Sequence, residues 1–138
     1  MAHENIWTGG RLIELTTQEC WELLASRPVG RIAYDDGEGP VVLPVNHLVC
    51  DRTIRFRTAP HSTLARHVHG HRVAFQLDDV EEFHTSGWSV LVRGRASLAD
   101  IDLRGGGDDA PTPWVEGNRP LIVEITPSEV TGRRLLGN

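Results

Sequence analysis

A two-residue alternation of apolar and polar side chains runs from Gly87 to Leu98, and it constrains the fold more than any other feature of the chain. One side of the expected strand is apolar and the other is polar or charged: the two sets are Trp88, Val90, Val92 and Ala96, and Ser89, Arg93, Arg95 and Ser97. A period of two is typical of a β-strand that buries one face and exposes the other. The sequence therefore predicts a long, half-buried strand here.

Shorter strand signals occupy much of the remaining chain, and turn-forming residues separate them. The expected strands are 29–34, 41–49, 54–58, 72–78 and 121–125, the last closing toward Val130. Stretches such as "DDGEGP" and "CDRT" carry the Gly, Asp and Pro residues that favour turns. Together with 87–98, these segments predict six strands at short spacing.

Two helices are expected between the strands. In Thr16–Ser26, the spacing of Thr16 and Glu19 is that of a capping box, and Ser62–Val68 forms a shorter piece that ends at Gly70. Two helices are too few for parallel crossovers, so the chain is expected to be mainly β, an antiparallel barrel or sandwich. A barrel is favoured because closure removes exposed strand edges.

Length and composition indicate a single domain spanning residues 1–138. The chain has 138 residues, of which 39% are hydrophobic and 24% charged, so it has enough apolar surface to build a core. Its apolar runs are too short for a membrane span, and "MAHENIWTGG" lacks the features of a signal peptide. Cys20 and Cys50 form neither a disulfide framework nor a metal-ligand pattern. We therefore expect a cytoplasmic protein with no membrane partner.

All 14 basic residues are arginine, and the sequence contains no lysine. With 19 acidic residues the net charge is −5, which argues against a nucleic-acid partner bound by counterion release. The absence of lysine excludes Schiff-base chemistry through the protein. An anion site in this chain must use arginine, backbone N–H groups or hydroxyls.

Four histidines fall within the segment "HSTLARHVHGH": His61, His67, His69 and His71. Histidine is a common ligand of metals and haem, so a haem or metal protein is one alternative. However, Gly70 breaks the helical register, and no HExxH motif is present. Surface histidines near a helix end are the favoured interpretation, and no metal site is predicted.

Six stretches occur together in one order: "RPVGRIAY", "PVVLPVNHLV", "IRFRTAPHSTL", "VAFQLDD", "GWSVLVRGRA" and "VTGRRL". In this combination the sequence resembles the pyridoxamine 5′-phosphate oxidase-like family of flavin-binding split barrels, over about Leu15 to Leu135. The resemblance implies a six-stranded antiparallel split β-barrel with a few short helices. It also implies a homodimer that holds FMN in clefts between its subunits. Some relatives use a deazaflavin coenzyme instead, and a few bind haem.

The expected phosphate site lies around the turn at Pro60. Arg57 ends a strand, and Thr58, Ser62 and Thr63 lead into the short helix, whose start offers unpaired N–H groups. A guanidinium can clamp a phosphate through two charge-assisted hydrogen bonds. Relatives place the FMN phosphate here, although Thr63 stands where they often carry lysine. The alternative makes Arg57 a solvated strand residue and Ser62 a plain helix cap.

The flavin ring is expected against four segments of the barrel. The resemblance places Val45, Asn46 and Gln76 along the ring, with the Gln76 amide donating to ring carbonyls. Trp88 and Ser89 occupy positions where relatives contact the cofactor across the dimer interface. In the alternative, Trp88 and Phe75 are core residues of alternating strands.

Two further positions resemble residues that reach a partner's cofactor, Trp114 and Arg133. The alternative makes Trp114 a loop anchor and Arg133 a solvated tail residue. A dimer is also expected because an open sheet face, with Trp88 and nearby valines, is costly to expose.

The function expected from this sequence is that of an FMN-dependent oxidoreductase acting on a small organic substrate. One alternative is a non-catalytic flavin-binding or flavin-sequestering protein, and another is a deazaflavin-dependent reductase. No catalytic residue is predicted, and His47 is the one acid–base candidate near the expected ring. Pyridoxamine-phosphate oxidation itself is not expected, because the chain lacks lysine and the loop before Trp114 shows no second phosphate site.

Overall fold

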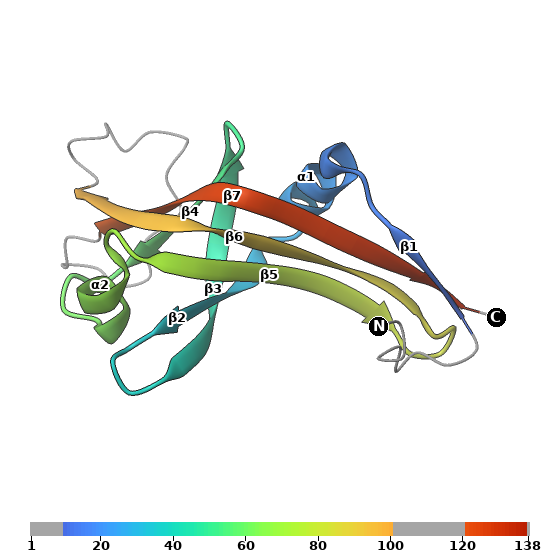
Figure 1. The fold of residues 1–138 in the computed structure, drawn as a ribbon, viewed down its shortest axis with the longest axis horizontal. Helices are drawn as coiled ribbons and strands as arrows, with labels where there is room; N and C mark the ends of the chain where they lie inside the picture. Colours follow the sequence, from blue (N-terminus) through green and yellow to red (C-terminus); the bar gives the residue numbers. More distant parts are fainter. Residues whose placement is uncertain (1–9, 101–120, 138) are drawn as a thin grey trace.

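The computed structural model describes residues 10–100 and 121–137. Its elements follow the chain in this order: β1 (Arg11–Glu14), α1 (Thr17–Ser26), β2 (Val29–Asp35), β3 (Pro40–Cys50), β4 (Thr53–Thr58), α2 (Thr63–Val68), β5 (Arg72–Glu81), β6 (Ser86–Asp100) and β7 (Leu121–Leu136). Figure 1 shows long strands wrapped around a common interior, with α2 at one end and α1 beside β7.

Six strands close into an antiparallel barrel in the order β7-β4-β3-β2-β5-β6, and β6 pairs back onto β7. This arrangement confirms the predicted mainly β fold, a six-stranded antiparallel barrel with two helices. The longest seam joins β6 to β7, from Gly87 opposite Leu135 to Asp100 opposite Leu121. The alternating segment thus pairs along nearly its whole length.

The last strand is longer than predicted, and one short strand was not predicted at all. β7 runs to Leu136 because Glu129–Leu135 continues the pairing with β6 beyond the barrel. Its residues "TGRR" break the apolar alternation, so the sequence pattern ends early. β1 adds to this extension opposite Arg133–Leu136, and all four of its residues are exposed. A strand with no buried face leaves no alternation to detect.

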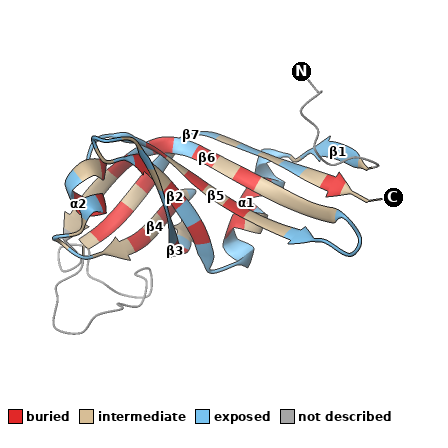
Figure 2. Ribbon diagram, turned by 90° about the horizontal axis from the view of Figure 1, so that it is seen from below, coloured by how far each residue is buried: buried red, intermediate tan, exposed pale blue. Residues whose placement is uncertain are grey.

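The barrel interior holds one continuous apolar cluster. Its fully buried members include Ile32, Phe56, Phe75, Val90 and Val92, contributed by four strands. Figure 2 shows the buried positions recurring along the strands, as the two-residue period requires. Gly30 is needed where β2 passes the Phe75 ring, because a Cβ at Gly30 would lie 2.2 Å from a ring carbon.

The predicted capping box is present at the start of α1. Thr16 Oγ1 accepts from the Glu19 N–H at 3.1 Å, and Glu19 Oε1 accepts from the Thr16 N–H at 2.8 Å. These bonds lower the pKa of Glu19, because they favour its ionised form. The helix buries Cys20, Trp21 and Leu24. Among the described residues, no helix is long and apolar enough to cross a bilayer.

His47 is a buried polar residue inside the barrel, only 4% exposed. Its Nε2 lies 2.8 Å from the carbonyl oxygen of Leu24 at the end of α1, and its ring packs edge-on against Phe75 at 4.8 Å. Burial lowers the pKa of His47, with a smaller opposing effect from backbone hydrogen bonds to Leu24 and Pro28. The imidazole therefore joins α1 to β3 and does not face the outer wall, where the ring of a bound cofactor was expected.

Candidate functional site

The outer face of β2, β5, β6 and β7 brings several predicted site residues together. Two rows of paired residues cross it: Arg31, Gln76, Leu91 and Thr131, and then Asp78, Ser89 and Arg133. Directly opposed residues of antiparallel strands project to the same side of the sheet. Gln76, Ser89 and Arg133 therefore share one face.

The Gln76 side chain belongs to a hydrogen-bonded network that the sequence analysis missed. Arg31 Nη1 donates to Gln76 Oε1 at 2.9 Å, and Gln76 Nε2 donates to Asp78 Oδ2 at 2.9 Å. Arg31 Nη1 also lies 3.6 Å from Asp78 Oδ1. The network fixes the amide orientation and leaves one Gln76 N–H for a ligand. Alternation within each strand predicts that Arg31 and Asp78 face outward. That they lie next to each other depends on the register between β2 and β5, which the sequence pattern does not give.

Ser89 and Arg133 are directly paired neighbours at the β1 end of this face. They line a cavity of about 350 Å³ together with Leu12, Ile13, Glu14, Leu91, Thr131 and Gly132. Arg133 is exposed, which agrees with the alternative that it is a solvated residue. On its other side, Arg133 pairs with Glu14 of β1, which carries a carboxylate. The cavity thus offers both an arginine and a hydroxyl beside apolar side chains.

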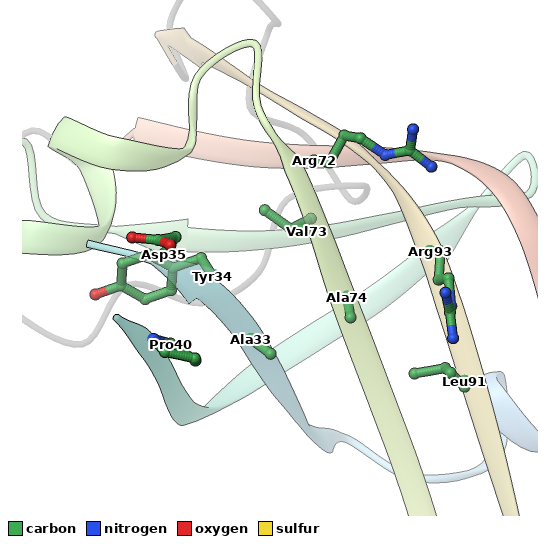
Figure 3. Close-up of a pocket in the computed structure, with 9 residues that line it drawn as sticks. All are labelled: Ala33, Tyr34, Asp35, Pro40, Arg72, Val73, Ala74, Leu91 and Arg93. Carbon is green, nitrogen blue, oxygen red and sulfur yellow. The ribbon is translucent and has the colours of Figure 1, made fainter. Parts of the chain in front are cut away.

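A second cavity of about 380 Å³ lies on the same outer face and shares Leu91 with the first. Its lining residues come from β2, β3, β5 and β6, and Figure 3 shows them: Ala33, Tyr34, Asp35, Pro40, Arg72, Val73, Ala74, Leu91 and Arg93. No residue predicted for the cofactor site lines it.

The expected phosphate residues gather at the other end of the barrel, where β4 leads into α2. Thr58 Oγ1 and Ser62 Oγ lie 2.7 Å apart, and Ser62 Oγ accepts from the Ala65 N–H at 3.0 Å. Ser62 is therefore a helix cap, and Thr63 is the exposed first residue of α2. Phe56 of β4 pairs with His47, so the next residue, Arg57, is near Asn46 of β3. The structure thus brings these five predicted residues to one corner.

Arg57 carries the unusual electrostatics of this corner. It is half-buried, and its Nε is shielded from water without a hydrogen-bond partner among the described residues. Burial lowers the pKa of Arg57, because removal from water disfavours the charged form. Arginine nevertheless stays protonated in proteins. The corner therefore holds a half-buried positive charge at the end of β4, followed by two hydroxyls that bond to each other at the start of α2.

Val45 and Trp88 turn away from the outer face. Val45 is buried in the interior, and Trp88 is half-buried and packs against the core cluster with Val90 and Val92 on its side of β6. Trp88 was expected on an open sheet face, but its side chain packs against the core cluster instead. Phe75 is also a core residue. Trp114 lies outside the described residues.

The histidine-rich segment forms local hydrogen bonds. The Nδ1 atoms of His67 and His71 lie near backbone carbonyls, of Thr63 at 2.8 Å and of His67 at 3.2 Å. His69 Nδ1 accepts from the Leu98 N–H at 2.9 Å. Across residues 10–99 and 121–137, no three His, Cys, Asp or Glu side chains are grouped to hold a metal ion.

The structure is a closed six-stranded antiparallel β-barrel whose outer face carries rows of paired polar residues. The sequence model of the family described as pyridoxamine 5′-phosphate oxidase matches residues 16–134. This chain therefore belongs to the pyridoxamine 5′-phosphate oxidase family. The resemblance seen in the sequence is confirmed at this level.

Relatives support the assignment over most of the chain. An uncharacterized protein of Mycobacterium tuberculosis is 32% identical over 133 residues, covering 92% of this chain and 88% of the relative. The FAD binding protein from Mycobacterium smegmatis has a structure with a TM-score of 0.79 and 33% identity, covering 91% of this chain and 100% of that one. A FAD-binding protein from Mesorhizobium loti, with a TM-score of 0.70 and 21% identity over 92% and 98% of the two chains, shares the fold.

Proposed function

We propose that this protein is a flavin-dependent oxidoreductase that binds FMN and acts on a small organic substrate. The observation that carries the proposal is Arg57, whose desolvated Nε has no partner among the described residues. An anion beside this half-buried guanidinium restores the electrostatic stabilisation that partial burial removes. A phosphate accepts the Arg57 N–H groups and the one hydroxyl hydrogen that the bond between Thr58 and Ser62 leaves free.

Similarity supports a flavin as the group that carries this phosphate. The FAD binding protein from Mycobacterium smegmatis is 33% identical to this chain and shares its fold. Flavins bring their own redox chemistry, and the protein supplies binding, orientation and electrostatics. FAD and FMN both contain the isoalloxazine ring and the first phosphate, so both fit the residues named here. A deazaflavin coenzyme shares the same phosphate chemistry.

Each candidate residue has a stated role in this proposal. Arg57, Thr58 and Ser62 bind the phosphate, and Asn46 lies beside them. Thr63 places a neutral hydroxyl, where relatives often carry lysine, at the start of α2. Gln76, held by Arg31 and Asp78, directs its free N–H toward a ring carbonyl. The bound isoalloxazine supplies hydride or electron transfer to the substrate.

We also propose a homodimer, because the resemblance places Ser89 and Arg133 against a partner's cofactor, and the β6–β7 seam separates them along the strands from Arg57. Arg57 pairs with Ile122, which pairs with Ala99 of β6. Ser89 precedes Ala99 by ten residues, or about 33 Å at roughly 3.3 Å per strand residue. A second copy would bring its Ser89 and Arg133 to a cofactor held at Arg57, as the resemblance implies.

A shared cleft links assembly to cofactor binding. Because FMN would then bind the dimer and not the monomer, FMN is expected to lower the protein concentration at which the dimer dissociates. Sedimentation of the protein at falling concentration, with and without FMN, measures this shift. A monomer that binds FMN as tightly as the dimer would contradict the shared cleft.

Two measurements test the function itself. The absorption spectrum of the purified protein, followed by mass spectrometry of the released cofactor, distinguishes FMN, FAD, a deazaflavin and haem. Single-turnover reduction by a nicotinamide donor then separates an oxidoreductase from a flavin-sequestering protein. Bleaching of the bound flavin at a rate well above that of free flavin is expected. A flavin that binds but is reduced no faster than in solution would favour the non-catalytic alternative.

A further inference from the structure

Three arginines gather on the outer face of β5 and β6, toward the α2 end of the sheet. Arg72 pairs directly with Arg95, and Arg93 lies two residues along β6 on the same face. Like charges on a directly opposed cross-strand pair repel each other and destabilise the sheet. None of the three is a residue of the proposed flavin site, whose Gln76 pairs with Leu91, two residues from Arg93.

The protein neutralises this positive charge only in part. Arg95 Nη1 donates to the Gly70 carbonyl at 2.8 Å, and Arg93 Nε lies 3.7 Å from Glu129 Oε1. Within residues 10–99 and 121–137, no carboxylate forms an ion pair with Arg72. Asp35 also lines the cavity, where its Oδ1 accepts from the Gly37 N–H at 2.7 Å. Positive charge therefore remains in excess beside Arg72 and Arg93, in a chain whose net charge is −5.

A cavity of about 380 Å³ adjoins these guanidinium groups. Figure 3 shows Arg72 reaching from β5 toward β6, Arg93 beside β6, and Ala74 and Leu91 on the same stretch of sheet. Ala33 and Ala74 are paired neighbours, and their small side chains leave room above the sheet. The cavity is shallow and largely open to solvent, and its volume is within the range of small-molecule sites, about 300–1,000 Å³.

A break in the β6–β7 seam lies next to Arg93. Arg93 pairs with Glu129, but Gly94 pairs with Pro127, so Ser128 is an extra residue on β7. The Ser128 hydroxyl donates to the Arg93 carbonyl at 3.2 Å. Bulges of this kind redirect side chains and recur beside functional sites. Gly94 is required here, since a Cβ would lie 2.2 Å from the Thr126 carbonyl oxygen.

We propose that this cavity binds a small organic anion, with a flat apolar body and one carboxylate or phosphate group. Arg72 and Arg93 bind the anionic group, because a guanidinium presents paired N–H donors that match its oxygens. The apolar body lies against Ala33, Ala74 and Leu91. Binding offsets the repulsion between Arg72 and Arg95. The site is separate from the Arg57 corner, and its Leu91 pairs with Gln76 of the proposed ring site.

Calorimetric titration of the full-length protein with benzoate tests the proposal, with neutral benzamide as the isosteric control. Benzoate is expected to bind at least tenfold more tightly than benzamide. The double variant Arg72→Gln/Arg93→Gln is expected to weaken benzoate binding about tenfold or more and to leave benzamide unchanged. Arg52→Gln, which removes one exposed charge at the β3–β4 turn, is expected to bind benzoate like the parent. Phenyl phosphate in place of benzoate distinguishes a phosphate from a carboxylate preference.

Three outcomes would overturn the site. They are undetectable binding of both benzoate and phenyl phosphate at millimolar concentration, affinity for the bound anion no higher than for benzamide, and equal affinity for that anion in the double variant and the parent. Urea unfolding shows that the variants fold. Without ligand, Arg72→Gln is expected to unfold at a urea midpoint equal to or above that of the parent, because it relieves the repulsion with Arg95. A lower midpoint would contradict the excess of positive charge on which the proposal rests.

Discussion

Arg57 and His47 each hold a side-chain nitrogen away from water without a hydrogen-bond partner among the described residues, but in opposite settings. His47 lies inside the barrel, where burial lowers its pKa and favours the neutral ring. Arg57 lies on the wall, and a guanidinium cannot become neutral at physiological pH. The interior site therefore tolerates its unpaired nitrogen by staying uncharged. The wall site keeps a charge that an anion would stabilise.

The largest expected effect on stability comes from replacing His47, the buried residue of this comparison. His47→Ala removes a packed ring and leaves the Leu24 carbonyl unpaired, so we expect a loss of about 2–4 kcal/mol in the free energy of unfolding. His47→Gln is the matched control, because its amide N–H can still donate to Leu24. Urea unfolding is expected to place His47→Gln between the parent and His47→Ala. If His47→Ala were as stable as the parent, the imidazole would not hold α1 to β3.

A smaller effect is expected at the other end of the same helix. Thr16→Ala removes the capping hydroxyl that accepts the Glu19 N–H, at a cost of about 1 kcal/mol. Thr16→Ser keeps the hydroxyl and serves as the control. Thermal unfolding of the three proteins measures the difference. Equal midpoints for Thr16→Ala and Thr16→Ser would show that the cap does not stabilise α1.

The smallest expected effect is the pH dependence of stability that His47 causes. The ordinary pKa of histidine is 6.5, and folding lowers that of His47. The unfolded chain therefore binds the proton first, so stability falls as pH decreases from about 6.5 through the folded-state pKa. Urea midpoints measured across this range are expected to fall more steeply in the parent than in His47→Gln, which cannot titrate. Parallel curves would show that His47 does not take part.

The strands that alternate strictly could be predicted from the sequence, whereas the contacts between strands could not. The two-residue period correctly predicts that Trp88 and Ser89 face opposite sides of the sheet. It does not predict which residues of other strands lie beside them. The network of Arg31, Gln76 and Asp78 depends on the register between β2 and β5, and no local pattern encodes that register.

The phosphate corner shows the same division. Ser62 could be recognised as a helix cap from local spacing, and its cap is present. The half-buried setting of Arg57 depends on β4 pairing with β7, more than sixty residues later in the chain. The alternation of Arg55 and Arg57 with apolar residues predicts solvated arginines at both positions. Pairing with β7 gives the two arginines different surroundings. Arg55 forms an ion pair with Glu124 at 2.8 Å, whereas the Nε of Arg57 has no hydrogen-bond partner among the described residues.

Titration of the cofactor-free protein with FMN and riboflavin tests the central claim most directly. Arg57→Ala removes a charge-assisted contact worth about 1.5–3 kcal/mol, so FMN is expected to bind roughly ten- to hundredfold more weakly. Riboflavin, which lacks the phosphate, is expected to bind the variant and the parent equally, and Arg52→Ala is expected to leave both affinities unchanged. Equal FMN affinity in Arg57→Ala and the parent would contradict the claim that this arginine binds the flavin phosphate.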